Sequence, residues 1–323
     1  MPAPSSPVLR IGTRRSKLAL AQSGMMQRAI ARALKVEPER VELVEIVTTG
    51  DRVQDRRLLE IGGKALFTKE IEEALLDGRV DLAVHSMKDV PADQPDGLDI
   101  LAVPLREDAA DAFISHDAPS FAELSMGARL GTASLRRQAQ ALALRPDLKI
   151  EMLRGNVDTR LRRLQEGDFD AILLAASGLN RLGLSEVIRE RLSLDDFLPA
   201  PGQGALAIQG RAADRERHAD WIAALNHGPT ATAVAAERGA MVALEGSCRT
   251  AVGAHARIDG DVLTLTTEIL APSGAARWRR SGAMPQATSA NALADARALG
   301  ERLGGEVHAA SGDQEITDAE LSA

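Results

Sequence analysis

The chain has a single cysteine, Cys248, within residues 244–250 (LEGSCRT). A lone thiol cannot form a disulfide within the chain, and it lacks the companions that a zinc site needs. Two interpretations remain: an inert buried side chain, as free cysteines often are, or a nucleophile that bonds covalently to another group. Composition alone favours the inert interpretation. The arrangement of the basic residues favours the nucleophile.

Two distant segments share a Gly-Thr turn, hydroxyl side chains and an arginine pair. Residues 8–22 (VLRIGTRRSKLALAQ) and 128–140 (ARLGTASLRRQAQ) each predict a strand, a turn and a helix capped by a hydroxyl. The arginine pairs 14–15 and 136–137 then stand near helix N-termini, where positive charge opposes the helix dipole. These could be two ordinary strand-to-helix turns. However, free N–H groups, hydroxyls and guanidinium groups together bind carboxylates or phosphates, so we predict an anionic ligand held by two similar lobes.

Other predicted strands also lead into polar residues. Strands at 81–84, 148–153 and 169–176 precede the segment 85–91 (HSMKDVP), Arg154 and Arg181 respectively. Ligands of open α/β sheets collect at such carboxyl ends of strands. Gly62-Gly63-Lys64 resembles a phosphate loop but lacks its spacing and the following Ser or Thr. We expect it to be either a flap that offers Lys64 to a cleft or a loop with a solvated lysine.

The order of these elements predicts an α/β fold with two lobes and a smaller C-terminal α+β domain, which 323 residues can accommodate. The first lobe is expected to comprise residues 8–104 with 202–222, and the second residues 110–198. The third domain would span residues 225–310 and carry Cys248 near its start. Residues 199–204 (PAPGQG) predict a return crossing, after which residues 205–208 form a strand of the first lobe.

The composition also restricts the partners and the compartment. A net charge of −7 with five Phe, two Trp and no Tyr argues against a nucleic-acid partner. No apolar run approaches the roughly 20 residues of a membrane helix, and residues 1–7 lack the features of a signal peptide. Together with the unpaired cysteine, this predicts a cytoplasmic protein without a membrane partner. The six histidines form no pair with metal-ligand spacing, so we expect no metal, and we expect His85 to be structural.

Four segments closely resemble the porphobilinogen deaminase (hydroxymethylbilane synthase) family, and they occur in the family's order: 85–91 (HSMKDVP), 131–138 (GTASLRRQ), 153–161 (LRGNVDTRL) and 244–248 (LEGSC). The resemblance extends from Leu9 to about Arg280. It implies three domains, the first two built like type II periplasmic binding proteins, and a monomer. It also implies one dipyrromethane cofactor per chain, joined to Cys248 by a thioether.

The activity that the resemblance implies is that of a transferase in tetrapyrrole (haem) biosynthesis. Four porphobilinogen molecules are joined head to tail, each with release of ammonia, to give hydroxymethylbilane. Each porphobilinogen carries an acetate and a propionate, which would explain arginines at helix N-termini. Loss of ammonia leaves a cation on the pyrrole, and a carboxylate in a water-poor cleft would stabilise it.

By resemblance, Asp89 is the catalytic carboxylate, although an aspartate in this position would otherwise be assigned to a turn or cap. Lys88 either assists the departure of ammonia or holds a carboxylate. The cofactor contacts implied are Cys248, Ser86, Lys88, Asp89, Thr132, Ser134, Arg136, Arg137, Arg160 and Arg181. The substrate contacts implied are Arg14, Ser16, Lys64, Arg154, Arg160 and Gln203.

The chain departs from the family pattern at two places. Leu59-Glu60 stand where members often have a lysine, which weakens the expected contact at Lys64, and Arg249 stands where small polar or amide residues also occur. The main alternative is a non-catalytic two-lobed anion-binding protein of the solute-receptor type, which would need neither Cys248 nor Asp89. A phosphate-handling transferase would need a phosphate loop or a carboxylate cluster for a metal, and the sequence has neither.

Overall fold

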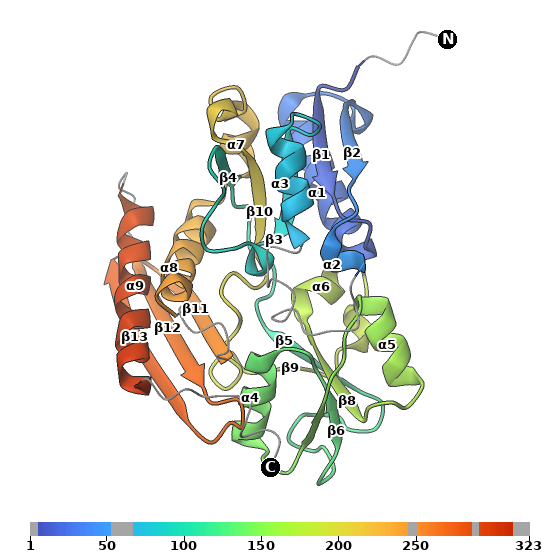
Figure 1. The fold of residues 1–323 in the computed structure, drawn as a ribbon, viewed down its shortest axis with the longest axis vertical. Coiled ribbons are helices and arrows are strands. Elements are labelled where there is room, and N and C mark those ends of the chain that lie inside the picture. Colours follow the sequence, from blue (N-terminus) through green and yellow to red (C-terminus); the bar gives the residue numbers. More distant parts are fainter. Residues whose placement is uncertain (1–5, 53–66, 245–250, 286–290, 313–323) are drawn as a thin grey trace. The chain divides into compact units, whose positions relative to one another are not determined.

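The computed structural model describes residues 6–52, 67–244, 251–285 and 291–312 (Figure 1). The chain divides into two compact units, Met1–Arg106 with Ala205–Ala231, and Glu107–Gly204 with Thr232–Ala323. The C-terminal α+β region therefore belongs to the same unit as the second lobe, where the sequence predicted a third domain.

The first unit contains one sheet and the helices that cover it. Its elements are β1 (Leu9–Thr13), α1 (Lys17–Leu34), η1 (Pro38–Arg40), β2 (Val41–Glu45), α2 (Thr49–Arg52), α3 (Lys69–Leu76), β3 (Leu82–Ser86), η4 (Met87–Asp89), β4 (Leu98–Ala102), β10 (Leu206–Arg211), η6 (Ala212–Asp214) and α7 (Ala219–Leu225).

The second unit contains two sheets. Its elements are β5 (Asp111–Ser115), β6 (Arg129–Gly131), α4 (Leu135–Leu144), β7 (Lys149–Glu151), α5 (Val157–Gln165), β8 (Ala171–Ala175), α6 (Ala176–Arg181), η5 (Ser185–Val187), β9 (Glu190–Arg191), β11 (Ala251–Asp259), β12 (Val262–Leu270), β13 (Arg277–Pro285) and α9 (Ala292–Ser311). Helix α8 (Gly228–Leu244) begins in the first unit and continues into the second.

The two lobes share one sheet topology. The first sheet has the order β2-β1-β3-β10-β4, and the second has the order β7-β6-β8-β5-β9. In each, three neighbouring strands are parallel and the fourth is antiparallel. The strand expected at 205–208 is part of β10, which pairs with β3 and β4 of the first lobe. The carboxyl ends of the parallel strands meet at one edge of each sheet, so side chains that follow them are brought together.

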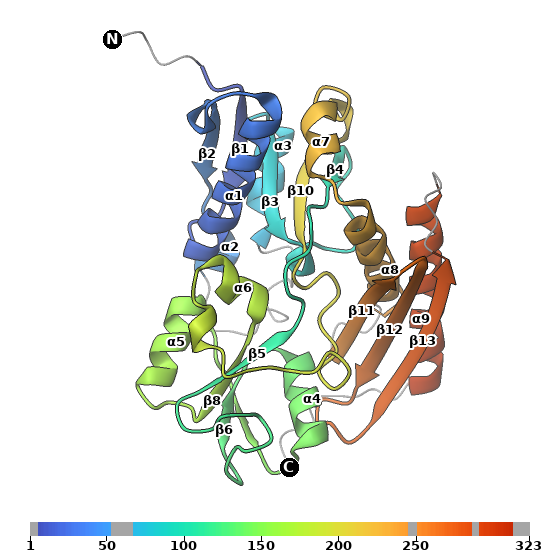
Figure 2. The same ribbon diagram turned by 180° about the vertical axis from the view of Figure 1, so that it is seen from behind.

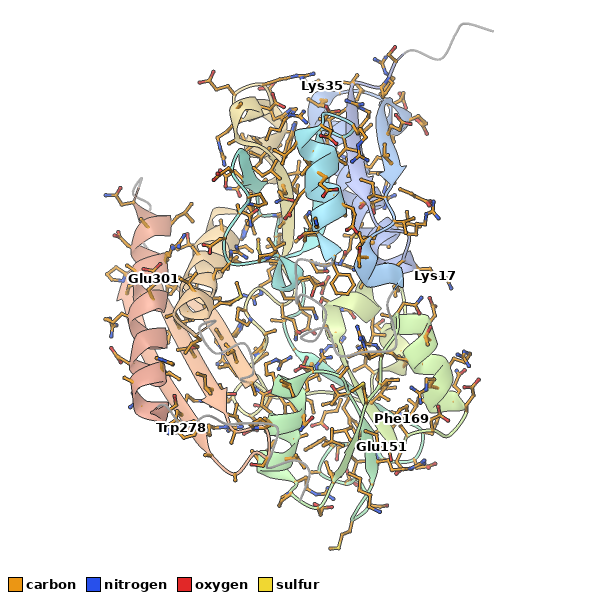
Figure 3. All side chains as sticks on the ribbon, viewed as in Figure 1. Lys17, Lys35, Glu151, Phe169, Trp278 and Glu301 are labelled. Atoms are coloured by element: carbon orange, nitrogen blue, oxygen red, sulfur yellow. The ribbon has the colours of Figure 1, made fainter. Side chains whose placement is uncertain are left out.

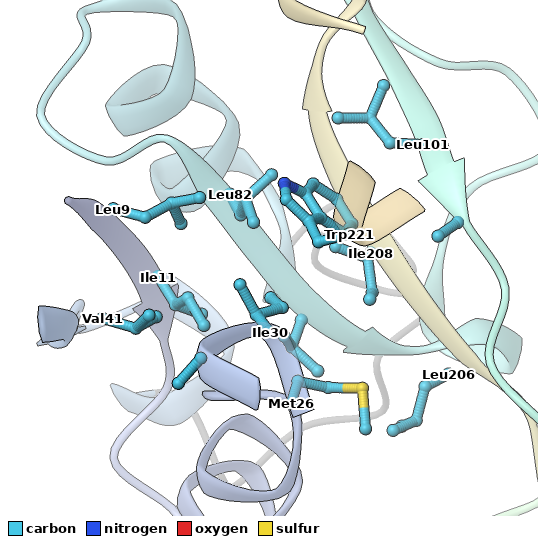
Figure 4. Packing of buried hydrophobic residues seen from close by; sticks show 13 residues of the cluster. Leu9, Ile11, Met26, Ile30, Val41, Leu82, Leu101, Leu206, Ile208 and Trp221 are labelled. Atoms are coloured by element: carbon cyan, nitrogen blue, oxygen red, sulfur yellow. The ribbon is translucent and has the colours of Figure 1, made fainter. Parts of the chain in front are cut away.

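Apolar side chains on the face of the first sheet that α1 and α7 cover help to hold the first unit together. Figure 4 shows Ile11 of β1, Leu82 of β3 and Ile208 of β10 packed with Ile30 of α1 and Trp221 of α7. All five are almost completely inaccessible to water. At about 25 cal/mol per Å² of buried apolar area, such packing is the main force that fixes the strand ends in place.

A Gly-Thr pair at the end of β1 and another at the end of β6 each lead to a serine that caps the next helix. Ser16 Oγ accepts from the Ala19 N–H at the start of α1, and Ser134 Oγ accepts from the Arg137 N–H at the start of α4. At Gly131, an added Cβ would lie 2.8 Å from the Phe169 ring and 3.0 Å from Leu153. Glycine therefore allows β6 to pack closely where it turns into α4.

The C-terminal sheet is antiparallel in the order β11-β12-β13, and α8 and α9 pack together against it (Figures 1 and 2). Leu263 and Leu265 of β12 point to the same side and pack in one cluster with alanines of α8 and with Ala296, Leu299 and Leu303 of α9. Ala139 of α4 packs with Ala251 and Leu270, so this sheet also contacts the second lobe. Among the described residues, no helix is long and apolar enough to cross a membrane.

Candidate functional site

In the first unit, Arg14 and Ser16 follow β1. The Arg14 guanidinium lies over the Phe67 ring, 4.2 Å from its centroid, so a cation–π contact orients this half-buried side chain. Ser16 caps α1, which begins at Lys17 (Figure 3). Arg15 is exposed and lies 3.2 Å from Glu45 in an ion pair. Of the arginine pair 14–15, only Arg14 was predicted to bind ligand.

Ser86, Lys88 and Asp89 follow β3, which is the parallel neighbour of β1. Gln22 Nε2 donates to Ser86 Oγ at 3.1 Å. A 3₁₀ turn then places Lys88 and Asp89, held by a bond from the Val90 N–H to the Met87 carbonyl at 3.1 Å. Both side chains are half-buried. This unit therefore presents one carboxylate beside two cations at the strand edge.

In the second unit, Thr132 and Ser134 follow β6 and are engaged by the backbone. Thr132 Oγ1 accepts from the Ser134 N–H at 3.1 Å, and the Thr132 N–H donates to the Glu151 carbonyl at 3.0 Å. These bonds hold the turn between β6 and α4. Thr132 is buried and Ser134 is half-buried.

Arg136 and Arg137 occupy different surroundings from those predicted. Both are buried, and both bind the fully buried Asp111 of β5. Arg136 Nη1 lies 2.7 Å from Asp111 Oδ2, and Arg137 Nη2 lies 2.7 Å from Asp111 Oδ1. Arg136 Nη1 also donates to Gln140 Oε1 and to the Leu198 carbonyl, at 2.9 Å each. The sequence predicted that the positive charges of Arg136 and Arg137 have no protein partner at the start of α4. The structure corrects this, because the Asp111 carboxylate binds both guanidinium groups. Their direct contact with a cofactor stays a prediction.

The charge state of Asp111 follows from its partners. Burial alone would raise the pKa of this carboxyl group, but the guanidinium groups of Arg136 and Arg137 hold the pKa well below its usual range. Asp111 is therefore ionised at neutral pH, and the group of three carries one net positive charge. The sequence carried a usable signal, since Asp111 is a lone carboxylate within the apolar run 109–114 and buried carboxylates need partners.

Gln203 also has surroundings that the sequence did not predict. Its side chain is fully buried, and its Nε2 donates to the Ala109 carbonyl at 2.7 Å and to Asp111 Oδ1 at 2.9 Å. In this structure Gln203 is an internal partner of Asp111, and its contact with substrate stays a prediction. The reason is backbone geometry: Gly202 and Gly204 both adopt positive φ, and they turn the 199–204 segment so that the amide points inward.

Arg154 and Arg181 have guanidinium nitrogen atoms without a protein acceptor. Arg154 Nη1 and Arg181 Nε are buried and unbonded in the described part of the chain. Arg181 Nη2 does donate to the Gly204 carbonyl at 2.6 Å, and burial lowers the pKa of Arg181, partly offset by Glu107. A buried cationic donor without an acceptor is costly. An anionic ligand would relieve that cost.

Arg160 lies on α5, directly after the turn that carries Arg154. Its Nε donates to the Gly155 carbonyl at 2.8 Å, and Gly155 has a φ of +114°. Arg154 follows β7 and Arg181 follows β8, which are the two parallel neighbours of β6. Lys64 and Cys248 lie outside the described residues. Within the described residues, no group of His, Cys, Asp and Glu could hold a metal ion.

The fold and the side chains at its strand ends define an anion-binding α/β protein with an appended α+β region. The family description "Porphobilinogen deaminase, dipyromethane cofactor binding domain" matches residues 9–219, and "Porphobilinogen deaminase, C-terminal domain" matches residues 231–309. The chain belongs to the porphobilinogen deaminase family. The resemblance seen in the sequence is thereby confirmed, and a purely anion-binding receptor is disfavoured.

Three curated relatives illustrate how far the similarity extends. A porphobilinogen deaminase of Caulobacter sp. (strain K31) is 60% identical over 94% of this chain and 96% of the relative. The Phenylobacterium zucineum protein of the same name is 58% identical over 96% and 98%. The Nitrobacter hamburgensis protein is 48% identical over 95% of each. Among solved structures, the methionine binding protein MetQ has a TM-score of 0.43 and 15% identity, covering 67% of this chain and 89% of that chain.

Proposed function

We propose that this chain joins four porphobilinogen molecules head to tail on a dipyrromethane primer attached to Cys248, releasing ammonia at each step and giving hydroxymethylbilane. The similarity to relatives named porphobilinogen deaminase over nearly the whole chain carries this proposal. The cationic strand ends support it, because the substrate and the product carry an acetate and a propionate on every pyrrole ring.

The residues present fit the cofactor that the family uses. Arg154 Nη1 and Arg181 Nε are buried donors without an acceptor among the described residues, and a guanidinium group binds a carboxylate in a bidentate manner. We propose that Arg154, Arg160 and Arg181 hold ligand carboxylates together with the hydroxyls of Thr132 and Ser134 in the same unit. We propose that Ser86 of the first unit also contacts the cofactor. When bound, the dipyrromethane supplies the pyrrole carbon from which the chain of rings grows.

We propose that the first unit supplies the catalytic charge. A fixed carboxylate at Asp89 would stabilise the positive charge that develops on the substrate pyrrole as ammonia departs. Arg14 and Lys88 would orient substrate carboxylates, and Lys88 could also assist the departing ammonia. Lys64, Cys248 and the finer division of roles are taken from the family resemblance. For Arg136, Arg137 and Gln203, we propose that their contacts with Asp111 hold the second lobe's strand edge in shape.

An intact-mass measurement tests the proposed function. Purified active protein should exceed its sequence mass by a two-ring pyrrole adduct, and peptide mapping should place that adduct on Cys248. Cys248→Ala should fold without the adduct. Active protein with unmodified Cys248 would overturn the proposal.

We also propose that the protein acts as a monomer in the cytoplasm, since an unpaired cysteine that must stay reactive suits a reducing compartment. Light scattering on the active protein should give the mass of one chain, 34.3 kDa plus the adduct. A stable dimer in the same measurement would refute the monomer.

A further inference from the structure

A buried chain of polar side chains lies behind the segment that carries Lys88 and Asp89, entirely within the first unit. Gln209 on β10 is fully buried. Its Oε1 lies 3.0 Å from His85 Nε2, and its Nε2 donates to Gln94 Oε1 at 2.9 Å and to Glu72 Oε1 at 3.4 Å. Gln94 Nε2 in turn donates to the Pro91 carbonyl at 3.4 Å. Both ends of the 85–91 segment are thus joined to Gln209.

The orientation of these amides follows from their outer partners. The Pro91 carbonyl can only accept a hydrogen bond. Gln94 must therefore direct its Nε2 towards Pro91 and its Oε1 towards Gln209. Gln209 must then direct its Nε2 towards Gln94 and Glu72, which leaves Oε1 facing His85. The ring of His85 must consequently donate from Nε2, which selects one tautomer.

The surroundings of His85 also determine its charge. Burial lowers the pKa of His85 to about 4, while Gln209 and Asp89 act to raise it and Arg14 acts to lower it. The charged groups nearby are Asp89 on η4, Arg14 after β1, Glu72 on α3 behind Gln209, and Lys88 within the segment. At neutral pH His85 is therefore uncharged, with its proton on Nε2. A cation at this position would compete for Asp89 with the developing charge of the substrate.

We propose that Gln209 is a positioning residue that holds the neutral ring of His85 in its Nε2–H tautomer and anchors the segment that carries Asp89. The inference rests on the proposed function only for the role of Asp89 in turnover. No contact with substrate is assigned to Gln209. Gln209 acts by fixing the proton of His85 on Nε2 and by anchoring the segment 85–91.

The first test needs no activity. Holoenzyme labelled with ¹⁵N-histidine should show His85, assigned by the loss of its signal in His85→Asn, as the neutral Nε2–H tautomer from pH 8 to below pH 5.5. Gln209→Glu places a carboxylate against the ring and should move the midpoint of the His85 titration upward by about one pH unit or more. Gln209→Leu removes the acceptor and should allow the Nδ1–H form to appear. A wild-type His85 that is Nδ1–H, or that titrates near 6.5, overturns the proposal, as does an unchanged midpoint in Gln209→Glu.

The second test measures single-turnover consumption of porphobilinogen by the same proteins. In Gln209→Glu the rate should fall about tenfold per pH unit below the raised midpoint, because only the neutral-His85 fraction reacts. The rate of the wild type should not fall over this pH range. Gln27→Glu is the matched control: it makes the same change of charge in the first unit, where Gln27 Nε2 donates to the Val41 carbonyl at 2.7 Å, and its profile should match the wild type.

The two tests separate the failure of this inference from the failure of the proposed function. A wild-type holoenzyme that consumes no porphobilinogen refutes the proposed function, whatever the His85 spectrum shows. A Gln209→Glu variant with a shifted His85 midpoint and an unshifted rate profile refutes the coupling between His85 and Asp89 that is proposed here.

Discussion

At the scale of single residues, the arginines of the second lobe form two groups. Arg136 and Arg137 have a permanent carboxylate partner in Asp111, with N–O distances of 2.7 Å. Arg154 and Arg181 each keep a buried nitrogen without an acceptor in the described structure. Arg136 Nε is also buried without an acceptor among the described residues, so what sets the first group apart is the carboxylate of Asp111 that Arg136 and Arg137 share.

Substitution by leucine should distinguish these groups. Arg136→Leu should destabilise the fold by about 3 to 5 kcal/mol, because a buried charge loses one of its partners. Arg154→Leu should leave the free energy of unfolding within about 1 kcal/mol of wild type and slow single-turnover addition of porphobilinogen. Urea unfolding and rapid-quench kinetics measure the two effects. A stable, inactive Arg136→Leu and an unfolded Arg154→Leu would reverse the assignment.

Asp89 should affect chemistry and leave the fold intact. Asp89→Asn preserves size and hydrogen bonding but removes the charge, so we expect a loss on the order of a hundredfold to a thousandfold in rate. Asp89→Glu should keep part of the activity, because its charge survives in a displaced position. Asp93→Asn, at an exposed position of the following loop, is the control and should be unaffected. The measurement is single-turnover addition to holoenzyme, and equal rates for wild type and Asp89→Asn would place the stabilising charge elsewhere.

At the scale of elements, Asp111 joins β5 to α4 and to the 199–204 segment, and its effect depends on pH. The folded pKa of Asp111 lies below the ordinary value of 3.8. Its contribution to stability is therefore fully present above that value and is lost as pH falls through the folded pKa. Asp111→Asn should cost about 3 to 5 kcal/mol at neutral pH. In urea titrations, the difference in free energy of unfolding between wild type and Asp111→Asn should stay constant down to about pH 5. It should become smaller below about pH 4. A difference that narrows near pH 7 would point to another group.

Two glycines of α9 should respond oppositely to alanine. A Cβ at Gly300 would lie 2.0 Å from the Ala236 carbonyl oxygen of α8, whereas at Gly305 it would meet nothing within 4 Å. Gly300→Ala must separate the helices and should destabilise by about 1 to 3 kcal/mol or more. Gly305→Ala should stabilise by up to about 1 kcal/mol, because alanine favours the helix. The Tm of both variants, measured by thermal unfolding, tests this prediction. Equal changes in Tm would mean that α8 and α9 are less closely packed than described.

Local chemistry could be predicted from the sequence, and long-range pairing could not. The Gly-Thr turns, the hydroxyl caps at Ser16 and Ser134 and the late strand β10 follow from short patterns whose physics is local. The partner of Arg136 is a residue 25 positions away in the chain, and no spacing rule indicates it. The hydrogen bond of Gln203 to Asp111 could not be predicted for the same reason, since the inward direction of Gln203 depends on how the glycines beside it turn. The sequence identified the polar residues, but tertiary packing decided which of them point inward.

At the scale of the whole molecule, buried polar bonds tie the C-terminal sheet to the second lobe. Glu268 of β12 is fully buried and accepts from Gln140 Nε2 of α4 and from Arg279 Nε of β13, at 2.8 Å each. Glu237 of α8 accepts from the Gly202 N–H at 2.7 Å and from the Ala256 N–H of β11 at 2.8 Å. Cys248 lies in the sequence between α8 and β11. Both elements that flank Cys248 in the sequence are therefore fixed to the lobe that carries Arg154 and Arg181.

The bond between Gln140 and Glu268 should be the strongest single polar link across this contact. In a double-mutant cycle with Gln140→Ala and Glu268→Ala, we expect a coupling energy of about 1.5 to 3 kcal/mol, because the bond is buried and one partner is charged. Arg257→Ala removes an ion pair to Asp195 that also joins the sheet to the lobe, at 2.7 Å. Both side chains of that pair are at least half exposed, so it should contribute only about 0 to 1 kcal/mol. Urea unfolding measures all the variants. If the two alanine substitutions are additive within about 0.5 kcal/mol, the buried network does not hold the sheet to the lobe, and the apolar packing of α4 against Ala251 of β11 and Leu270 of β12 must do so.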